Sequence, residues 1–398
     1  MTSRFGRYIF LAGFFILATG GLVWFVQCGG SKGVSQETPA NAPRAWINSA
    51  VHQETSLEEA WSAAFQSDSV PRPTWKEVQD ARVYATPRGK ANYLQLLEGY
   101  GFRGLEAVSN LRAVLNDPDQ EIRRAAMRGL GRTETAEAES ILMAYAKEGV
   151  EIEESTEAAL VLGQMGNPSV TGKLQELLRQ AQDPVLREHL VDALAGRPWE
   201  QTQPFFSAHL RNKNVPLEEK QNALAMLGMR DTAPAGVLTG ALGDSNEEVR
   251  AGAYQGLAWR NETIESAKVR SSLKRETDSG LRGLAYEAWG NQIDAKCSEI
   301  QADYQKETQP EVQLRALKAW ARAYGRKPAE GNSFATEAIG RLEQVAMNDR
   351  DPGERKEALI GLQAVGSMES KDALGRIAVN NSSARIRNLA KSMSSSGH

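Results

Sequence analysis

The chain has 398 residues, of which 47 are Lys or Arg and 50 are Asp or Glu, so its formal net charge is -3. This balance gives no general attraction for polyanions, and nucleic acid is not expected as a partner. The apolar fraction of 41% and the aromatic fraction of 7% are typical of a folded helical protein rather than a disordered one. Two cysteines are too few for a disulfide framework or a cysteine-based zinc site.

The first predicted element is an uncharged apolar run at residues 8–27, preceded by a short basic segment at residues 1–7. A helix over this run is about 30 Å long at ~1.5 Å per residue, which matches the hydrocarbon core of a bilayer. Arg4 and Arg7 lie before the run, and no basic residue follows closely. The positive-inside rule therefore predicts a single-pass transmembrane helix with a cytoplasmic N-terminus, and places the rest of the chain across the membrane.

Cys28 comes directly after this run and leaves a second interpretation open. A cysteine at this place resembles the lipidation site of a bacterial lipoprotein, although Gln27 stands where such sites usually carry a small residue. The alternatives are a retained helix, lipidation at Cys28, or simple cleavage of a signal peptide. The retained helix is favoured by Tyr8 and Trp24 near its ends. It predicts a protein of the bacterial inner (cytoplasmic) membrane with its body in the periplasm or otherwise outside the cytoplasm.

The composition changes twice before a regular pattern begins. Residues 28–55 combine Gly, Ser, Pro, Asn and Gln without an apolar period, which predicts a flexible linker. Residues 56–104 carry three short helical patterns interrupted by Pro71 and Pro73. They predict an irregular helical cap at the start of a repeat array.

One pattern recurs over residues 105–393, and Val237 to Arg260 illustrates it. Two apolar stripes separated by a polar break predict two short amphipathic helices, which cannot bury their apolar faces without neighbours of the same kind. An index position aligns the units at intervals of 30 to 33 residues, with one longer step of 42. The index residues are Arg123, Ser155, Arg187, Lys220, Arg250, Arg282, Gln313, Arg355 and Arg387. The sequence therefore predicts an all-α fold, an α-solenoid of about nine two-helix repeats.

Two further segments depart from this pattern. The longer step contains residues 325–333, which are predicted to form a surface loop because they are rich in Gly, Pro and polar residues. At the other end, polar residues replace the apolar column in residues 394–398, which predicts a frayed tail.

The turn before the index residue resembles that of a known family. An Asp-containing turn precedes the index Arg in residues 116–131 (NDPDQEIRRAAMRGLG), 243–258 (GDSNEEVRAGAYQGLA) and 349–363 (DRDPGERKEALIGLQ). This pattern resembles HEAT-like repeats, in the short form that also occurs in phycobilin-lyase-type proteins. The resemblance covers residues 105–393 and implies the solenoid fold. It implies little about function, because one fold supports many functions.

The index arginines are interpreted as a structural ladder. A guanidinium in each second helix can bond the turn Asp or the backbone carbonyls of an adjacent unit and hold the stack in register. The ladder comprises Arg123, Arg187, Arg250, Arg282, Arg355 and Arg387. The alternative interpretation is a basic row that binds a ligand.

Three aromatic residues are candidates for binding a protein partner. Trp199 lies between units, and Tyr254 and Trp259 lie off the main apolar column. Exposed aromatic side chains are effective anchors at protein interfaces. The same side chains can equally pack between repeats, and the sequence leaves both options open.

No motif for catalysis, metal binding or cofactor binding is found. The four histidines, His52, His189, His209 and His398, are not followed by Glu, so the repeated His-Glu pairs that bind iron in some helical-repeat proteins are not expected. Cys297 has no neighbouring His in the sequence and is interpreted as an idle or buried thiol. No enzymatic activity and no cofactor are expected.

The leading functional hypothesis is a membrane-anchored scaffold or adaptor that presents a helical-repeat surface to a protein partner outside the cytoplasm. One alternative is a structural subunit of a larger membrane complex, in which the helix at residues 8–27 itself contacts partners. A third hypothesis, permitted by the family resemblance, is a lyase-like protein that handles a chromophore.

Overall fold

A computed structural model describes the chain in six stretches. They are residues 72–84, 86–147, 151–260, 265–328, 332–348 and 351–395. The predicted cytoplasmic segment, transmembrane helix, linker and Cys28 lie outside these residues, as do residues 56–71 of the predicted cap and 396–398 of the predicted tail. None of the described helices is long and apolar enough to span a bilayer. The membrane anchor stays a prediction.

All regular secondary structure in the described stretches is helical. The helices are α4 (Trp75–Ala81), α5 (Pro87–Tyr100), the 3-10 helix η1 (Gly101–Arg103), α6 (Leu105–Val114), α7 (Gln120–Arg132), α8 (Ala136–Tyr145), α9 (Ile152–Gln164), α10 (Ser169–Gln180), α11 (Pro184–Ala195), α12 (Trp199–Arg211), α13 (Leu217–Met229), α14 (Ala235–Ala241), α15 (Glu247–Trp259), α16 (Ser266–Leu273), α17 (Ser279–Asn291), α18 (Cys297–Tyr304), α19 (Pro310–Arg326), α20 (Asn332–Asn348), α21 (Pro352–Val365), α22 (Met368–Asn380) and α23 (Ala384–Ser395). The predicted all-α fold is confirmed for these residues.

From α6 onward the helices form pairs with the predicted period. The first helix of each pair precedes the index residue, and the index residue is the fourth residue of the second helix in every pair. The helical units therefore have the same internal register, even where Ser155, Lys220 or Gln313 replaces the arginine.

Two helices within the predicted cap continue the same arrangement. α4 packs on α5, and α5 packs on α7 as one second helix packs on the next. Thr74 and Thr86 cap these helices, since their side chains accept hydrogen bonds from Glu77 N and Gly89 N.

Aspartates in the turns explain where many second helices begin. The side chain of Asp183 accepts hydrogen bonds from Val185 N and Leu186 N at the start of α11, and that of Asp278 accepts one from Leu281 N at the start of α17. Such an N-cap stabilises a helix by about 1 kcal/mol. In two of the turns quoted from the sequence, Asp119 and Asp351 cap α7 and α21 in the same way.

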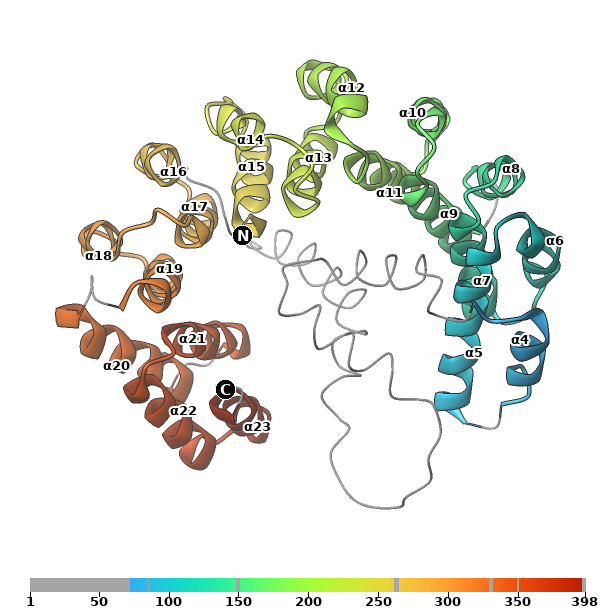
Figure 1. The fold of residues 1–398 in the computed structure, drawn as a ribbon. Helices are drawn as coiled ribbons and strands as arrows, with labels where there is room; N and C mark the ends of the chain where they lie inside the picture. The colour runs from blue at the N-terminus through green and yellow to red at the C-terminus, as the bar shows by residue number, and fades with distance from the viewer. Residues whose placement is uncertain are drawn as a thin grey trace. The chain divides into compact units, whose positions relative to one another are not determined.

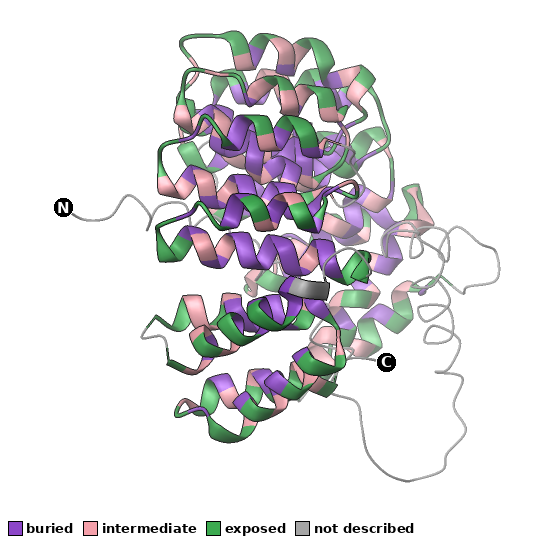
Figure 2. Ribbon diagram, turned by 90° about the vertical axis from the view of Figure 1, so that its left-hand side faces the viewer, coloured by how far each residue is buried: buried purple, intermediate pink, exposed green. Residues whose placement is uncertain are grey.

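The helices lie in two layers, as Figure 1 shows: the second helices α5, α7, α9, α11, α13, α15, α17, α19 and α21 line the inner side of the curve that the stack follows, and the first helices cover the outer side. Figure 2 shows buried positions recurring at each level of the stack. Positions three and seven residues after the index supply this core, and Ala253, Leu257, Trp289 and Trp320 are 0% exposed. Each pair therefore buries its apolar stripe against the pairs beside it.

Small residues allow the second helices to approach one another closely. A Cβ on Gly228 of α13 would lie 2.2 Å from the Cα of Gly256 in α15, and a Cβ on Gly163 of α9 would lie 2.8 Å from the Cα of Ala193 in α11. No side chain fits at such distances, so glycine is required at these contacts.

The longer repeat step is accommodated mainly by longer helices. The expected surface loop at residues 325–333 is wrong at its start, because α19 continues to Arg326 and Gly325 packs against the carbonyl of Ala364 in α21. α20 begins at Asn332 and, like α19, has 17 residues. Helical backbone bonds satisfy the polar groups that a long loop would expose to water.

Candidate functional site

Four index arginines clamp their own repeat to the next one. Nη1 of Arg250 donates to the carbonyl of Asp244 in its own turn at 3.0 Å, while Nε and Nη2 donate to Glu276 of the following unit at 2.7 and 2.9 Å. The carboxylate of Glu276 raises the pKa of Arg250. The same arrangement joins Arg123 to Glu154, Arg187 to Glu219 and Arg282 to Glu307.

This geometry refines the structural interpretation of the ladder. The bonded carbonyls belong to the arginine's own unit rather than an adjacent one, and a glutamate makes the connection between units. Arg387, in the last described unit, bonds only the carbonyls of Asn381 and Ser382. Gln313 retains the carbonyl bond, to Glu307 at 2.7 Å. Arg355 occupies the equivalent position at the fourth residue of α21.

A second row of arginines, which we did not predict, binds the ends of the second helices. Arg197 donates to the carbonyl of Asn167 at 2.8 Å, and Arg260 donates to that of Ala233 at 2.5 Å. Arg230 instead makes two 2.9 Å bonds to the carboxylate of Asp192. The signal was present in the sequence, because these three arginines each follow an index position by ten residues. Cations at helix C-termini also interact favourably with the helix dipole.

Two non-glycine residues adopt the left-handed backbone conformation at the same edge. Glu134 has a φ of 52° and Asp231 a φ of 51°. Both oxygens of the Glu134 carboxylate accept from Gly166 N in the next unit, at 3.0 and 2.9 Å. Asp231 forms an ion pair with Arg260. These side chains connect repeats, which explains why glycine does not occupy either position.

Ion pairs also link the inner-layer helices near both ends of the stack. Arg128 of α7 lies between Glu98 of α5 at 2.6 Å and Glu157 of α9 at 2.8 Å. Lys318 of α19 similarly contacts Glu287 of α17 at 2.5 Å. These rows neutralise their own charges, so they do not form a basic face for a polyanion.

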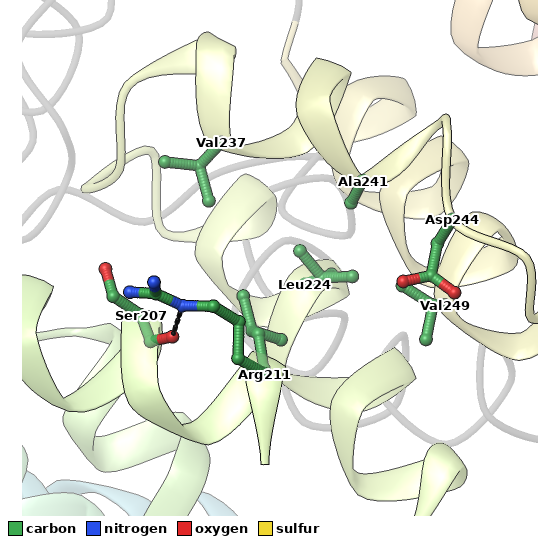
Figure 3. A pocket seen from close by; sticks show the side chains of 8 residues that line it. Ser207, Arg211, Leu224, Val237, Ala241, Asp244 and Val249 are labelled. Carbon is green, nitrogen blue, oxygen red and sulfur yellow. Dashed lines mark hydrogen bonds between the residues drawn. The ribbon is translucent and has the colours of Figure 1, made fainter. Parts of the chain in front are cut away.

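The outer layer has a groove between α12 and α14. Its volume is about 330 Å³, and Leu224 and Val249 are buried in its floor. Figure 3 shows Arg211 at one end and Asp244 at the other. Its lining residues are Ser207, Leu210, Arg211, Leu224, Val237, Ala241, Asp244 and Val249. The groove thus offers an apolar floor with opposite charges at its two ends.

The groove lies at a junction that lacks the arginine clamp. Lys220 replaces the index arginine in α13, so the clamp to a glutamate of the next unit is missing at this junction. The guanidinium of Arg211 bonds the carbonyl of Ser207 in its own helix at 2.7 Å, and the carboxylate of Asp244 accepts from Asn246 N at 2.8 Å. Neither charge therefore bridges α12 and α14.

The three aromatic candidates do not form one site. Tyr254 is fully buried and its hydroxyl donates to Ser272 at 2.7 Å, so it packs between repeats and its surface role is wrong. Trp199 is half-buried beside Phe206, with ring centroids 6.4 Å apart. Trp259 is 51% exposed and alone retains the exposure that an anchor needs.

The described residues bring together few groups for chemistry. They contain no group of three or more His, Cys, Asp or Glu side chains placed to hold a metal ion. Nε2 of His209 lies 3.2 Å from Glu219, and the imidazole ring packs on Phe205. His189 bonds a carbonyl of its own helix, and Cys297 is 1% exposed. Each of these groups is accounted for by packing.

Comparison with known families gives one match. Residues 108–195, which span α6 to α11, match the model for HEAT repeats. The predicted resemblance to HEAT-like repeats is confirmed. No curated protein matches the chain.

Solved structures give more distant similarities. The chain is 14% identical to importin beta, with a TM-score of 0.39, covering 90% of this chain and 53% of that one. It is 12% identical to Kap121p, with a TM-score of 0.43 and coverage of 90% and 52%. It is 17% identical to human deoxyhypusine hydroxylase in complex with glycerol, with a TM-score of 0.27 and coverage of 87% and 98%. Nothing about function follows at these TM-scores.

Proposed function

Since the chain is a HEAT-like helical-repeat protein, we propose that it is a non-enzymatic scaffold that binds another protein along its repeat surface. The observation that carries the proposal is the groove between α12 and α14. The half-buried Leu210, Val237 and Ala241 in its lining suit an apolar side chain of a partner, and the charged ends of the groove suit polar groups that flank it. The contacts on the other repeats hold the groove in a fixed geometry, which reduces the entropy lost on binding.

The proposal includes a membrane tether outside the cytoplasm. Residues 8–27 anchor the chain in a bacterial inner membrane, or Cys28 does so after lipidation, and residues 28–55 connect the anchor to the repeats. This rests on the sequence pattern alone. A tether raises the effective concentration of the repeat surface for a partner at the same membrane.

The two alternatives differ in where they place the contacts. A structural subunit of a larger membrane complex binds through residues 8–27 as well as through the repeats. A lyase-like protein needs titratable groups that converge on a bound chromophore. Arg211 and Asp244 stand at opposite ends of the groove, which favours the scaffold.

Site-specific crosslinking in cells tests the scaffold. A photoreactive amino acid at Ala241, inside the groove, should capture a discrete partner, whereas one at the exposed Val379 of α22 should not. Val237→Arg fills the groove and should abolish the product, while Val379→Arg should leave it unchanged. Identical products from both positions, or a product that survives Val237→Arg, contradict the proposal.

Deletion of residues 1–30 separates the remaining alternatives. The scaffold retains its partner when the isolated partner is mixed with the shortened chain, because the contacts lie in the repeats. A structural subunit loses its partners when the apolar run is removed. Fractionation of the full-length chain then tests the tether itself, since a membrane-anchored chain stays with the membrane after a high-salt wash.

A further inference from the structure

The edge where the second helices end carries two exposed apolar side chains. Trp259, the last residue of α15, is 51% exposed, and Ile293, just after α17, is 44% exposed. The side chain of Asn291 donates to the carbonyl of Ala258 and joins the two helix ends. Trp259 and Ile293 therefore lie on neighbouring steps of one edge.

Basic residues of α19 extend this surface by one step. Nη1 of Arg322 donates to Oδ1 of Asn291 at 2.8 Å, and Nη2 of Arg326 donates to two backbone carbonyls at the end of α17 at 2.7 and 2.9 Å. Lys327 follows in an exposed position. Neutral groups thus hold both guanidinium groups beside Ile293, and neither forms an ion pair with a described residue.

Three described carboxylates of α17, α18 and the turn between them have partners other than Arg322, Arg326 and Lys327. Asp294 accepts a hydrogen bond at 3.2 Å from Ser266 N, at the start of α16, and Glu299 pairs with Arg270 at 3.0 Å. Glu287 is held by two other basic side chains of α19. Among the described residues, no carboxylate forms an ion pair with Arg322, Arg326 or Lys327, so these side chains can bind carboxylates of a partner.

We propose that this edge binds an extended segment of a partner protein in which an apolar side chain is followed by acidic side chains. Trp259 and Ile293 contact the apolar side chain, and the basic residues Arg322, Arg326 and Lys327 bind the carboxylates. An aromatic anchor beside arginines is typical of the residues that dominate protein interfaces. Guanidinium groups also match carboxylates in geometry.

The dimensions of the edge fit a short segment. Packed helices lie about 8–10 Å apart, so α15 to α19 span roughly 20 Å. An extended chain of about six residues covers this length at ~3.3 Å per residue. Burial and the nearby Arg322 lower the pKa of Arg326, and the negative charge of a bound carboxylate favours the charged guanidinium. The inference rests on the proposed protein-binding function and adds a second surface and the chemistry of its partner.

Peptide binding to the full-length chain in non-ionic detergent tests the inference. The probe is a fluorescein-labelled peptide of sequence Gly-Leu-Gly-Glu-Glu-Glu-Gly, and the readout is fluorescence anisotropy. We expect saturable binding that weakens as salt is added. Trp259→Ser and the double variant Arg326→Gln with Lys327→Glu should each weaken binding at least about tenfold.

Matched controls make the result specific. Lys213→Glu reverses an exposed charge between α12 and α13, at the opposite edge, and should not change the affinity. Peptides with Lys in place of Glu, or Ser in place of Leu, should bind at least about tenfold more weakly. Unchanged melting of Trp259→Ser by circular dichroism excludes misfolding as the cause of its weaker binding.

The outcomes also separate this inference from the groove. Equal affinity for the three peptides, no binding, or full affinity in Trp259→Ser overturns the edge site. If the edge site is overturned but the crosslink at Ala241 still forms, the proposed function stands without the edge site. If the peptide binds normally to Val237→Arg while the crosslink was never formed, the groove fails and the edge site stands.

Discussion

The guanidinium of Arg187 donates from Nε and Nη2 to the two carboxylate oxygens of Glu219, at 2.9 Å each, across the junction between two repeats. The same arginine donates from Nη1 to the carbonyls of Leu178 and Ala181 at 2.8 Å. One side chain thus fixes the turn of its own unit and the second helix of the next.

This relationship predicts how stability depends on pH. Burial alone would raise the pKa of Glu219, but the His209 ring at 3.2 Å and the hydrogen bonds from Arg187 lower it from 4.5 to about 2. The unfolded chain therefore binds the proton more tightly, and folding gains stability as pH rises through this window. About 3 kcal/mol, at ~1.4 kcal/mol per pKa unit, is present above pH 4.5 and is lost as pH falls towards 2.

Urea unfolding between pH 7 and pH 3 measures this effect. Glu219→Gln should be less stable at pH 7 and should lose less stability on acidification than the unchanged chain. Gln182→Glu, at an exposed turn, serves as a control for adding a titratable group on the surface. Parallel stability curves for Glu219→Gln and the unchanged chain would contradict the assignment.

The left-handed residue Glu134 gives a second prediction with an internal control. Glu134→Ala loses the hydrogen bonds to Gly166 N and keeps the unfavourable backbone conformation, so it should destabilise the fold by about 2 kcal/mol. Glu134→Gly loses the same bonds but tolerates the φ of 52°. Thermal unfolding should therefore show that the glycine variant is more stable than the alanine variant by about 1 kcal/mol. The reverse order would show that the conformation is not retained.

Sequence periodicity was sufficient to predict the repeat fold. Positions such as Ala253 and Leu257 recur because each second helix contacts its two neighbours, and a contact that repeats in space leaves a repeat in the sequence. The end of α19 was predicted less well, because Gly325 reads as a loop residue in one dimension. In three dimensions it allows close contact with Ala364.

The candidate surfaces were predicted only in part. Both Trp259 and Tyr254 lie off the main apolar column in the sequence, but only Trp259 is exposed. Exposure depends on the angular position of a residue relative to the neighbouring unit. The groove depends on the relative placement of α12 and α14, which no local pattern encodes. The arginines at the helix ends did leave a signal at a fixed offset, and it can be sought in other repeat sequences.

The close contact between α13 and α15 yields a third prediction. Gly228→Ala introduces a Cβ 2.2 Å from the Cα of Gly256, so the two helices must separate. Overpacking of this kind costs about 1–3 kcal/mol, and backbone atoms cannot move aside as a flexible side chain does. Gly240→Ala in α14 is the matched control, because a Cβ there meets nothing within 4 Å. It should stabilise the fold by up to about 1 kcal/mol through helix propensity. Chemical denaturation measures the free energy of unfolding of both variants. If both are more stable, or both less stable, than the unchanged chain, the predicted packing is contradicted.

The buried hydroxyl of Tyr254 provides the last prediction, which also separates structure from binding. Its single proton is shared between Ser272 Oγ at 2.7 Å and Glu276 Oε1 at 3.1 Å, and Glu276 also accepts from Arg250. Tyr254→Phe keeps the ring and removes these bonds, so it should destabilise the fold by about 1–2 kcal/mol in urea unfolding. Its affinity for the acidic peptide should stay unchanged, whereas Trp259→Ser should show the opposite pattern of normal stability and weak binding. A loss of peptide binding in Tyr254→Phe at temperatures where the chain is folded would mean that the interior of the stack, and not its edge, governs recognition.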